Sequence, residues 1–199
     1  MKTRSHASVA IITWILLIFA VAVSVYYFSS TDSYVPASFS NARLESSVLA
    51  FELVTLLDSS VQSLDKISEE DKNGRFSSAL DLVEAESKNV DAARTKAMEL
   101  ANKLEIMALS IQDIRPSKAK NLALEAVTKE VSLLNHLNNY NLYFIDLLKN
   151  LKMKFSGDIN YDGDDVATSI FKMNSEANEI NTINNAFNEK LREFDRSVK

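Results

Sequence analysis

The feature that most constrains this chain is a seven-residue repeat between residues 75 and 114. Eleven of the twelve first and fourth positions in the repeat are apolar, and Glu86 is the exception. Such a repeat keeps one side of an α-helix apolar and favours knobs-into-holes packing with a left-handed supercoil. A long helix that packs lengthwise against other helices is therefore predicted. The twelve positions are Phe76, Ala79, Val83, Glu86, Val90, Ala93, Ala97, Leu100, Leu104, Met107, Ile111 and Ile114.

Three more segments carry seam residues at spacings of three and four, which place them on one face of a helix. The segments cover residues 41–68, 117–156 and 164–196. In the first segment the stripe is Leu44, Val48, Phe51, Val54, Leu57, Val61 and Leu64. In the second it is Ala123, Val127, Glu130, Leu134, Leu137, Asn141, Phe144, Leu148, Leu151 and Phe155. In the third it is Val166, Ile170, Met173, Ala177, Ile180, Asn184, Phe187, Leu191 and Phe194.

Short connections separate these segments. Gly74 can adopt the left-handed conformation that ends a helix, and Arg115-Pro116 ends the second helix because the residue before a proline avoids helical geometry. A single kinked helix through Pro116 is the alternative to a hairpin. Three glycines and two prolines are too few for the turns of a many-stranded sheet. The prediction is an all-α fold, with an antiparallel up-down-up-down four-helix bundle over residues 41–199.

The N-terminus predicts a transmembrane helix. A basic flank at residues 1–6 precedes residues 7–28, a run of 22 residues without a charge, and a bilayer span needs roughly 20. The basic flank is expected to stay in the cytoplasm, so that a stalk at residues 29–40 and the bundle lie outside it. A signal peptide cleaved after the Ala-Val-Ala sequence at residues 20–22, which would give a secreted protein, is the alternative.

The charge balance limits the partners. Beyond residue 28 the chain holds 20 Lys and Arg against 27 Asp and Glu, which disfavours nucleic acid because phosphate binding needs a basic surface. There is no cysteine, so neither a disulfide nor a thiolate metal site can form. The expected partners are the membrane, through a single-pass anchor, and either an envelope protein or a second copy of the chain.

Asn141 and Asn184 interrupt otherwise apolar seams. Simple antiparallel counting pairs Leu137 with Asn184 and Asn141 with Ile180, so the two amides are not predicted to meet. A polar residue in such a seam often fixes the register of the helices. A polar ligand site in the bundle interior is the alternative.

Residues 157–165 resemble the start of a calcium loop of the EF-hand or dockerin type, with Gly163 in place of the turn glycine. The twelfth position is Ser169, where those loops place a carboxylate, so at most a weak Ca²⁺ site is expected and no other cofactor. The other interpretation is an acidic loop that caps the last helix. The candidate metal ligands are Asp158, Asn160, Asp162 and Asp164.

Enzymatic activity is not predicted. His136 is the only histidine beyond the membrane flank, and Leu133 stands where a di-iron Glu-x-x-His motif needs a glutamate. No serine has the flanking glycines of a nucleophile elbow. His136 is therefore interpreted as a polar residue at the boundary of the bundle.

Alternating chain direction is expected to sort charge between the two ends of the bundle. The carboxylates of two turns would gather far from the membrane and bind a basic partner or divalent cations, and cations would gather near it. The acidic candidates besides the loop aspartates are Glu69, Glu70, Asp71 and Asp165, and the membrane-proximal basic residues are Arg115, Lys118, Lys120, Arg192 and Arg196. Leu142 and Tyr143 are predicted on an outer face, as a partner-docking patch or packed against neighbouring helices.

The expected function is that of a membrane-anchored extracytoplasmic helical bundle that acts as an interaction or scaffold protein. The layout is similar to the extracytoplasmic bundles of bacterial sensory receptors, but no second uncharged run of comparable length follows residue 28. The alternative is a sensor-like binding module of the cell envelope that captures a small ligand or Ca²⁺.

Overall fold

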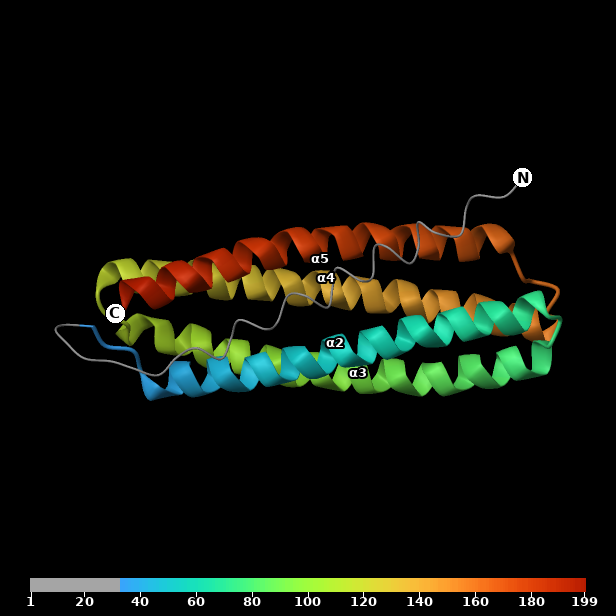
Figure 1. Cartoon of the computed structure of the whole chain (residues 1–199), viewed down its shortest axis with the longest axis horizontal. Coiled ribbons are helices and arrows are strands. Elements are labelled where there is room, and N and C mark those ends of the chain that lie inside the picture. The colour runs from blue at the N-terminus through green and yellow to red at the C-terminus, as the bar shows by residue number, and fades with distance from the viewer. Residues whose placement is uncertain (1–32) are drawn as a thin grey trace.

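The computed structural model describes residues 33–199, which form four long helices. α2 spans Ala37–Lys72, α3 Phe76–Ser110, α4 Ser117–Ser156 and α5 Gly163–Ser197, and a short 3-10 turn, η2, covers Ile111–Asp113. Consecutive helices run in opposite directions (Figure 1). The predicted all-helical bundle is confirmed for the described residues.

The helix ends follow the predicted turn signals closely. Gly74 and Gly157 both have positive φ values, 70° and 73°, and Gly157 ends α4 with its N–H and that of Asp158 bonded back to the last turn. α4 begins at Ser117, directly after Pro116, and runs antiparallel to α3 (Figure 1), so the single kinked helix is excluded. α2 begins at Ala37, four residues before the predicted start, because Pro36 stands just ahead of its first turn.

The predicted seam of α3 is confirmed, whereas that of α2 is wrong in its first half. Ten of the twelve α3 seam positions are buried. On α2, Leu44, Val48 and Phe51 are 58%, 52% and 63% exposed. The buried face instead carries Phe39, Ala42, Ser46, Leu49, Ala50 and Leu53. Small residues on that face allow the helix backbones to approach one another closely, and a pattern that counts only large apolar residues overlooks them.

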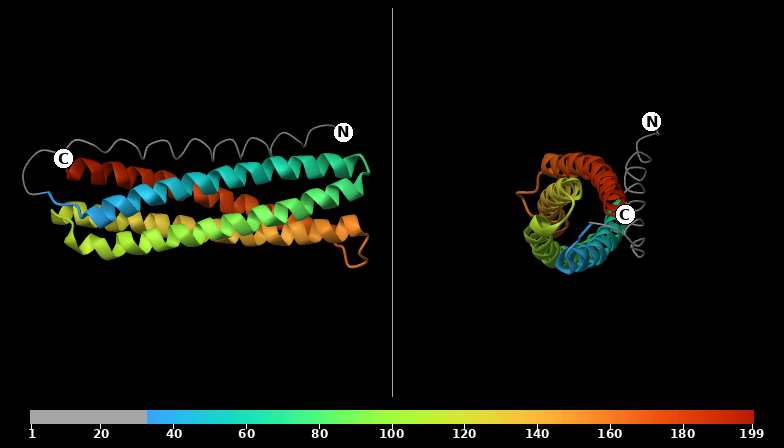
Figure 2. Two further views of the ribbon diagram at one scale, coloured as in Figure 1. Left: turned by 90° about the horizontal axis from the view of Figure 1, so that it is seen from below. Right: turned by 90° about the vertical axis from the view of Figure 1, so that its left-hand side faces the viewer.

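The helices pack in chain order around the bundle. α2 packs on α3, α3 on α4 and α4 on α5, as the end-on view in Figure 2 shows. α2 and α5 come together near the start of α2, where the rings of Phe39 and Phe194 lie 5.5 Å apart and Arg43 pairs with Asp195 at 2.6 Å. Toward the other end of the bundle the two helices separate, as the left view in Figure 2 shows.

The two ends of the bundle hold different turns of the chain. The α2–α3 turn and the α4–α5 loop lie at one end, here called the acidic end, and the α3–α4 turn and the C-terminus lie at the other, the basal end (Figure 1). At the basal end Tyr34 exchanges two backbone hydrogen bonds with Arg115, at 3.1 and 2.9 Å. Ser33 Oγ donates to the carbonyl of Val198 at 2.9 Å.

The proposed membrane segment at residues 7–28, the flank at residues 1–6 and the first residues of the stalk lie outside the described residues. None of the helices between residues 33 and 199 has both the length and the apolar character needed to cross a membrane.

Candidate functional site

A long apolar cavity lies where α2 and α5 separate. Its volume is about 570 Å³, and small-molecule pockets are typically of about 300–1,000 Å³. It is called the α2–α5 groove here, and α4 forms its floor. Among the apolar side chains that line it are Leu53, Val54, Leu57, Val61, Leu64, Leu133, Leu137, Leu147, Leu151, Val166, Ile170, Met173, Ile180 and Phe187.

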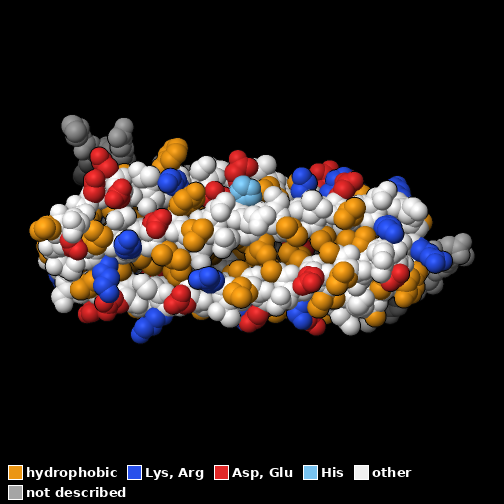
Figure 3. All heavy atoms as spheres, turned by 180° about the vertical axis from the view of Figure 1, so that it is seen from behind, with side chains coloured by type: hydrophobic (Ala, Val, Ile, Leu, Met, Phe, Trp, Pro, Cys, Tyr) orange, Lys and Arg blue, Asp and Glu red, His pale blue; other side chains and the backbone are white. Residues whose placement is uncertain are grey.

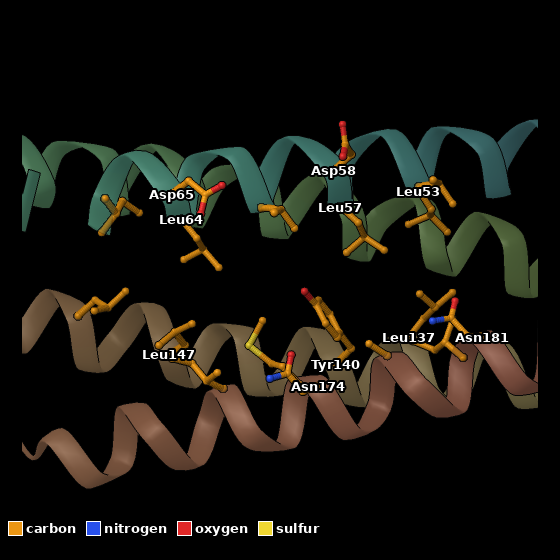
Figure 4. Close-up of a pocket in the computed structure, with 18 of the residues that line it drawn as sticks. Leu53, Leu57, Asp58, Leu64, Asp65, Leu137, Tyr140, Leu147, Asn174 and Asn181 are labelled. Carbon is orange, nitrogen blue, oxygen red and sulfur yellow. The ribbon is translucent and has the colours of Figure 1, made fainter. Parts of the chain in front are cut away.

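Figure 4 shows how the two walls face each other. Leu53, Leu57 and Leu64 extend from α2 toward the cavity, and Tyr140 and Leu147 face them from α4. The α2 residues that line the groove follow the heptad spacing that was predicted for the second half of that helix. α2 packs on α3, and this further apolar face of α2 borders the cavity.

Three polar side chains lie together in the part of the groove nearer the basal end. Asn184 is 3% exposed and Glu130 is 7% exposed, and Asn181 lies one helical turn from Asn184 on the same wall. Among residues 33–199, Asn184 Nδ2 and Asn181 Oδ1 are buried without a hydrogen-bond partner. We call Glu130, Asn181 and Asn184 the polar triad.

The register of α4 against α5 brings Glu130 to the level of this triad. Glu125 pairs with Lys190 at 3.1 Å, and His136 Nδ1 lies 2.6 Å from Glu176 Oε2. Counting antiparallel from either pair places Glu130 beside residues 182–185. The predicted pairing of Leu137 with Asn184 is therefore wrong by about two turns, because seven-residue patterns fix the facing sides of two helices but not their offset.

The electrostatics of the groove favour uncharged groups. Burial raises the pKa of Glu130 to about 7, and the positive charge of Arg43 opposes this rise. Burial also raises the pKa of Tyr140 to about 12. Both shifts have the same origin, since a low-dielectric surrounding disfavours the ionised form of an acid.

The other buried glutamate of a predicted seam, Glu86, has a different surrounding. It is fully buried between α2 and α3. Ser60 Oγ donates to its Oε1, and Asn89 Nδ2 donates to its Oε2 at 3.0 Å. Glu86 is thus a satisfied polar group of the closed α2–α3 seam, and it takes no part in the groove.

The predicted calcium loop is a turn that caps α5. Asp162 accepts a hydrogen bond from the Asp164 N–H at 2.9 Å, and Asp158 accepts from both nitrogens of Asn160. Ser169, the twelfth position of the motif, is buried inside α5. No cluster of three or more His, Cys, Asp or Glu side chains suited to a metal occurs in residues 33–199.

Ion pairs occupy part of the predicted acidic surface. Arg75 donates two hydrogen bonds to Glu70, at 2.6 and 2.7 Å, and these bonds lower the pKa of Glu70. Asp71 pairs with Lys154 at 2.5 Å. Glu69 and Asp165 are exposed. The acidic end therefore carries less free charge than the sequence alone suggests.

The predicted basic residues lie at the basal end. Arg115, Lys118, Arg192 and Arg196 are exposed, and Lys120 Nζ donates to the Gln112 carbonyl at 3.0 Å. They flank the point at which residues 33 and 34 join the bundle.

Leu142 and Tyr143 are not equivalent. Leu142 is 51% exposed, whereas Tyr143 packs against a core cluster and has Lys172 Nζ 5.1 Å from its ring centroid. Figure 3 shows apolar side chains along the middle of the face opposite that of Figure 1. The exposed large apolar residues of α3 and α4 are Phe76, Met98, Ile106, Leu109, Leu124, Val131, Leu142 and Ile145.

Comparisons with known proteins assign no family to the chain. No protein-family model, no curated protein and no solved structure matches it.

Proposed function

We propose that this protein is a membrane-anchored binding module that holds an apolar small molecule in the α2–α5 groove. The observation that carries the proposal is a cavity of about 570 Å³, lined by apolar side chains, in a bundle whose other seams are closed. Burial of a hydrocarbon chain there would remove its surface and that of the groove from water. The proposal involves no chemical step on the ligand.

The anchor in this proposal is the uncharged run at residues 7–28. The chain joins the bundle at the basal end, where the predicted basic residues lie, and cations are attracted to anionic lipid. With the N-terminus in the cytoplasm, the bundle would lie outside it with its acidic end away from the bilayer. Release after signal-peptide cleavage is the alternative for the same binding module.

Photo-crosslinking tests the groove. The full chain is placed in lipid nanodiscs with a diazirine-bearing dodecane, and the labelled peptides are mapped by mass spectrometry. We expect labels in α2 near Leu57 and Leu64 and in α5 near Met173. Val61→Trp, which fills the groove from the α2 wall, is expected to remove most of them.

Val48→Trp is the matched control, because Val48 lies on the same helix but is 52% exposed and does not line the groove. It is expected to keep the labelling pattern. Labels spread evenly over exposed apolar residues such as Leu109, and unaffected by Val61→Trp, would contradict the proposal.

A second candidate function is that of an interaction or scaffold protein. The exposed apolar residues of α3 and α4 favour it, since large apolar patches on soluble surfaces often mark contacts with proteins. Light scattering of the nanodisc-embedded chain tests self-association. A concentration-dependent dimer that Leu124→Glu abolishes would support it, whereas an unchanged monomer would leave the groove as the functional site.

Binding at the acidic end stays a prediction. If the end binds Ca²⁺ or a basic partner, replacing Asp158, Asp162 and Asp165 by asparagine should abolish binding without loss of helicity. Calcium that leaves the melting temperature unchanged would exclude a specific site, because a ligand of the folded state must stabilise it.

A further inference from the structure

We propose that the polar triad of Glu130, Asn181 and Asn184 recognises the uncharged, hydrogen-bonding head group of a straight-chain amphiphile whose tail lies along the groove. This inference rests on the proposed function and deepens it, since it names the ligand class and the direction in which the ligand lies.

The triad is a built polar site inside an apolar cavity. Asn184 is 3% exposed and its Nδ2 donor has no partner among the described residues, while Asn181 Oδ1 is a buried acceptor in the same condition. The Asn184 Oδ1 oxygen accepts from Asn188 at 3.3 Å, so the free donor is the part of the amide that remains for a ligand. Buried polar groups are normally paired, and leaving them unpaired is costly.

A single hydroxyl or primary amide fits this arrangement. A hydroxyl oxygen accepts from the Asn184 donor, and its proton can be donated to Asn181 Oδ1 or to Glu130. A primary amide presents one acceptor and two donors, so it matches all three members at once. A hydrocarbon without a head group would leave the triad unpaired.

The charge state of the site argues against ionised head groups. Burial raises the pKa of Glu130 and so disfavours its ionised form, and the protonated carboxyl both donates and accepts. Arg43, the cation whose charge acts on Glu130, is already bonded to Asp195 at 2.6 and 3.0 Å. An anionic head would also pass Asp58 and Asp65, which line the groove. A charged head of either sign would have to leave water for an apolar cavity.

The position of the triad sets the direction of the tail. From Asn181 the α5 wall continues through Met173 to Val166, a distance of about 22 Å at the helical rise of 1.5 Å per residue. The facing α2 wall provides Leu57, Val61 and Leu64. The tail therefore extends from the triad toward the acidic end of the bundle.

Competition with the dodecane crosslinker tests the inference. The full chain in nanodiscs is titrated with unlabelled dodecane, 1-dodecanol, dodecanamide, dodecanoate and dodecylamine, and each concentration is expressed as a mole fraction of lipid so that partitioning cancels. We expect 1-dodecanol and dodecanamide to displace the label at about 2- to 13-fold lower mole fraction than dodecane. This range corresponds to one net hydrogen bond of about 0.5–1.5 kcal/mol.

The outcomes separate the two proposals. If dodecane competes as well as the alcohol and the amide, head-group recognition is overturned while the groove still binds apolar chains. If none of the compounds competes, the proposed function itself fails. If dodecanoate or dodecylamine competes best, the site takes a charged head and the inference is wrong.

Two variants assign the effect to the triad. Asn184→Leu places an apolar residue in the α5 seam, and Glu130→Leu places one in the α4 seam. Each variant removes one member of the triad and is measured separately. Both should lose the preference for 1-dodecanol over dodecane and keep dodecane displacement, with helicity checked by circular dichroism. Glu86→Gln, in the closed α2–α3 seam, should keep the preference. If both leucine variants still prefer 1-dodecanol over dodecane, the triad does not recognise the head group.

Discussion

The α2–α3 seam and the α2–α5 groove differ in the hydrogen bonding that they offer to a buried glutamate. Each contains a buried glutamate in a predicted heptad seam. Glu86 accepts hydrogen bonds from Ser60 and Asn89 between two closely packed helices. No hydrogen bond reaches Glu130 from residues 33–199, and it borders a cavity. A buried glutamate whose hydrogen-bond acceptors are paired within the protein, such as Glu86, has a structural role. One without such donors, such as Glu130, is a candidate for binding a ligand.

The largest expected difference between the two regions concerns packing. Leu104→Ala, in the closed core where Leu104 is 2% exposed, should lower the free energy of unfolding by about 2–5 kcal/mol. Leu57→Ala, on the half-buried groove wall, should cost about 1 kcal/mol because the side chain buries less surface. Urea denaturation followed by circular dichroism measures both. Equal losses would mean that the groove wall is packed like the core.

The pH dependence of stability should reveal the burial of the Glu130 carboxyl. The pKa of Glu130 is about 7 in the folded state, against 4.5 for an exposed glutamate, so the folded state binds the proton more tightly. The stability that this group contributes is fully present below pH 4.5, falls as pH rises through this interval, and is about 3 kcal/mol lower above pH 7.

Glu130→Gln should remove this slope, and the difference between wild type and variant between pH 4.5 and 7 isolates it from other titrating groups. A slope that is unchanged in Glu130→Gln would show that the groove is not an apolar surrounding for that carboxyl.

Removing a donor from the closed seam should have a somewhat smaller effect. Ser60→Ala deletes one of the two side-chain donors to Glu86, and leaving a buried acceptor without its partner costs about 1–3 kcal/mol. Thermal denaturation of this variant is compared with that of Ser59→Ala, whose side chain is exposed. If the two variants have the same melting temperature, the hydrogen bond from Ser60 to Glu86 does not contribute to stability.

The smallest effect is expected at the acidic end of the groove. Lys154 pairs with Asp71 across it, and their side chains are 31% and 28% exposed. Lys154→Gln should cost about 0–1 kcal/mol of stability. Hydrogen exchange of the backbone amides in α2 near Asp71 gives a more sensitive measurement. If Lys154→Gln speeds up exchange there, relative to the wild type, more than it does in α3, then this ion pair holds the wall of the groove.

The helix ends and the buried face of α3 were predicted well because residues close together in the sequence determine them. Pro116 and Gly157 bound α4 at the predicted residues, and the α3 repeat identifies its buried face because large apolar residues dominate it. On α2, two faces compete. The predicted stripe of Leu44, Val48 and Phe51 is exposed, whereas the buried face includes Ser46 and Ser60. Serine is small enough for close helix packing, but it is polar, so a search for apolar residues does not find this face.

The groove could not be predicted, because it depends on the separation of two helices that are far apart in sequence. The sequence did indicate one of its polar residues, since Asn184 interrupts an apolar seam, but it contained no signal for Asn181 and identified Glu130 only as a seam position. It could not bring them together, because the offset of α5 against α4 is set by side-chain pairs such as His136 with Glu176. The interpretation of Asn184 as part of a polar ligand site remains a prediction.

The contacts of residues 33 and 34 determine how the bundle would respond to mechanical load. A pull on the chain ahead of Ser33 is resisted first by the paired backbones of Tyr34 and Arg115 and by the bond from Ser33 to Val198. Tension is thereby divided among the N-terminal segment, the middle of the chain and its last residues before it reaches α2. Load applied ahead of Ser33 therefore reaches the start of α2 only after these three hydrogen bonds break.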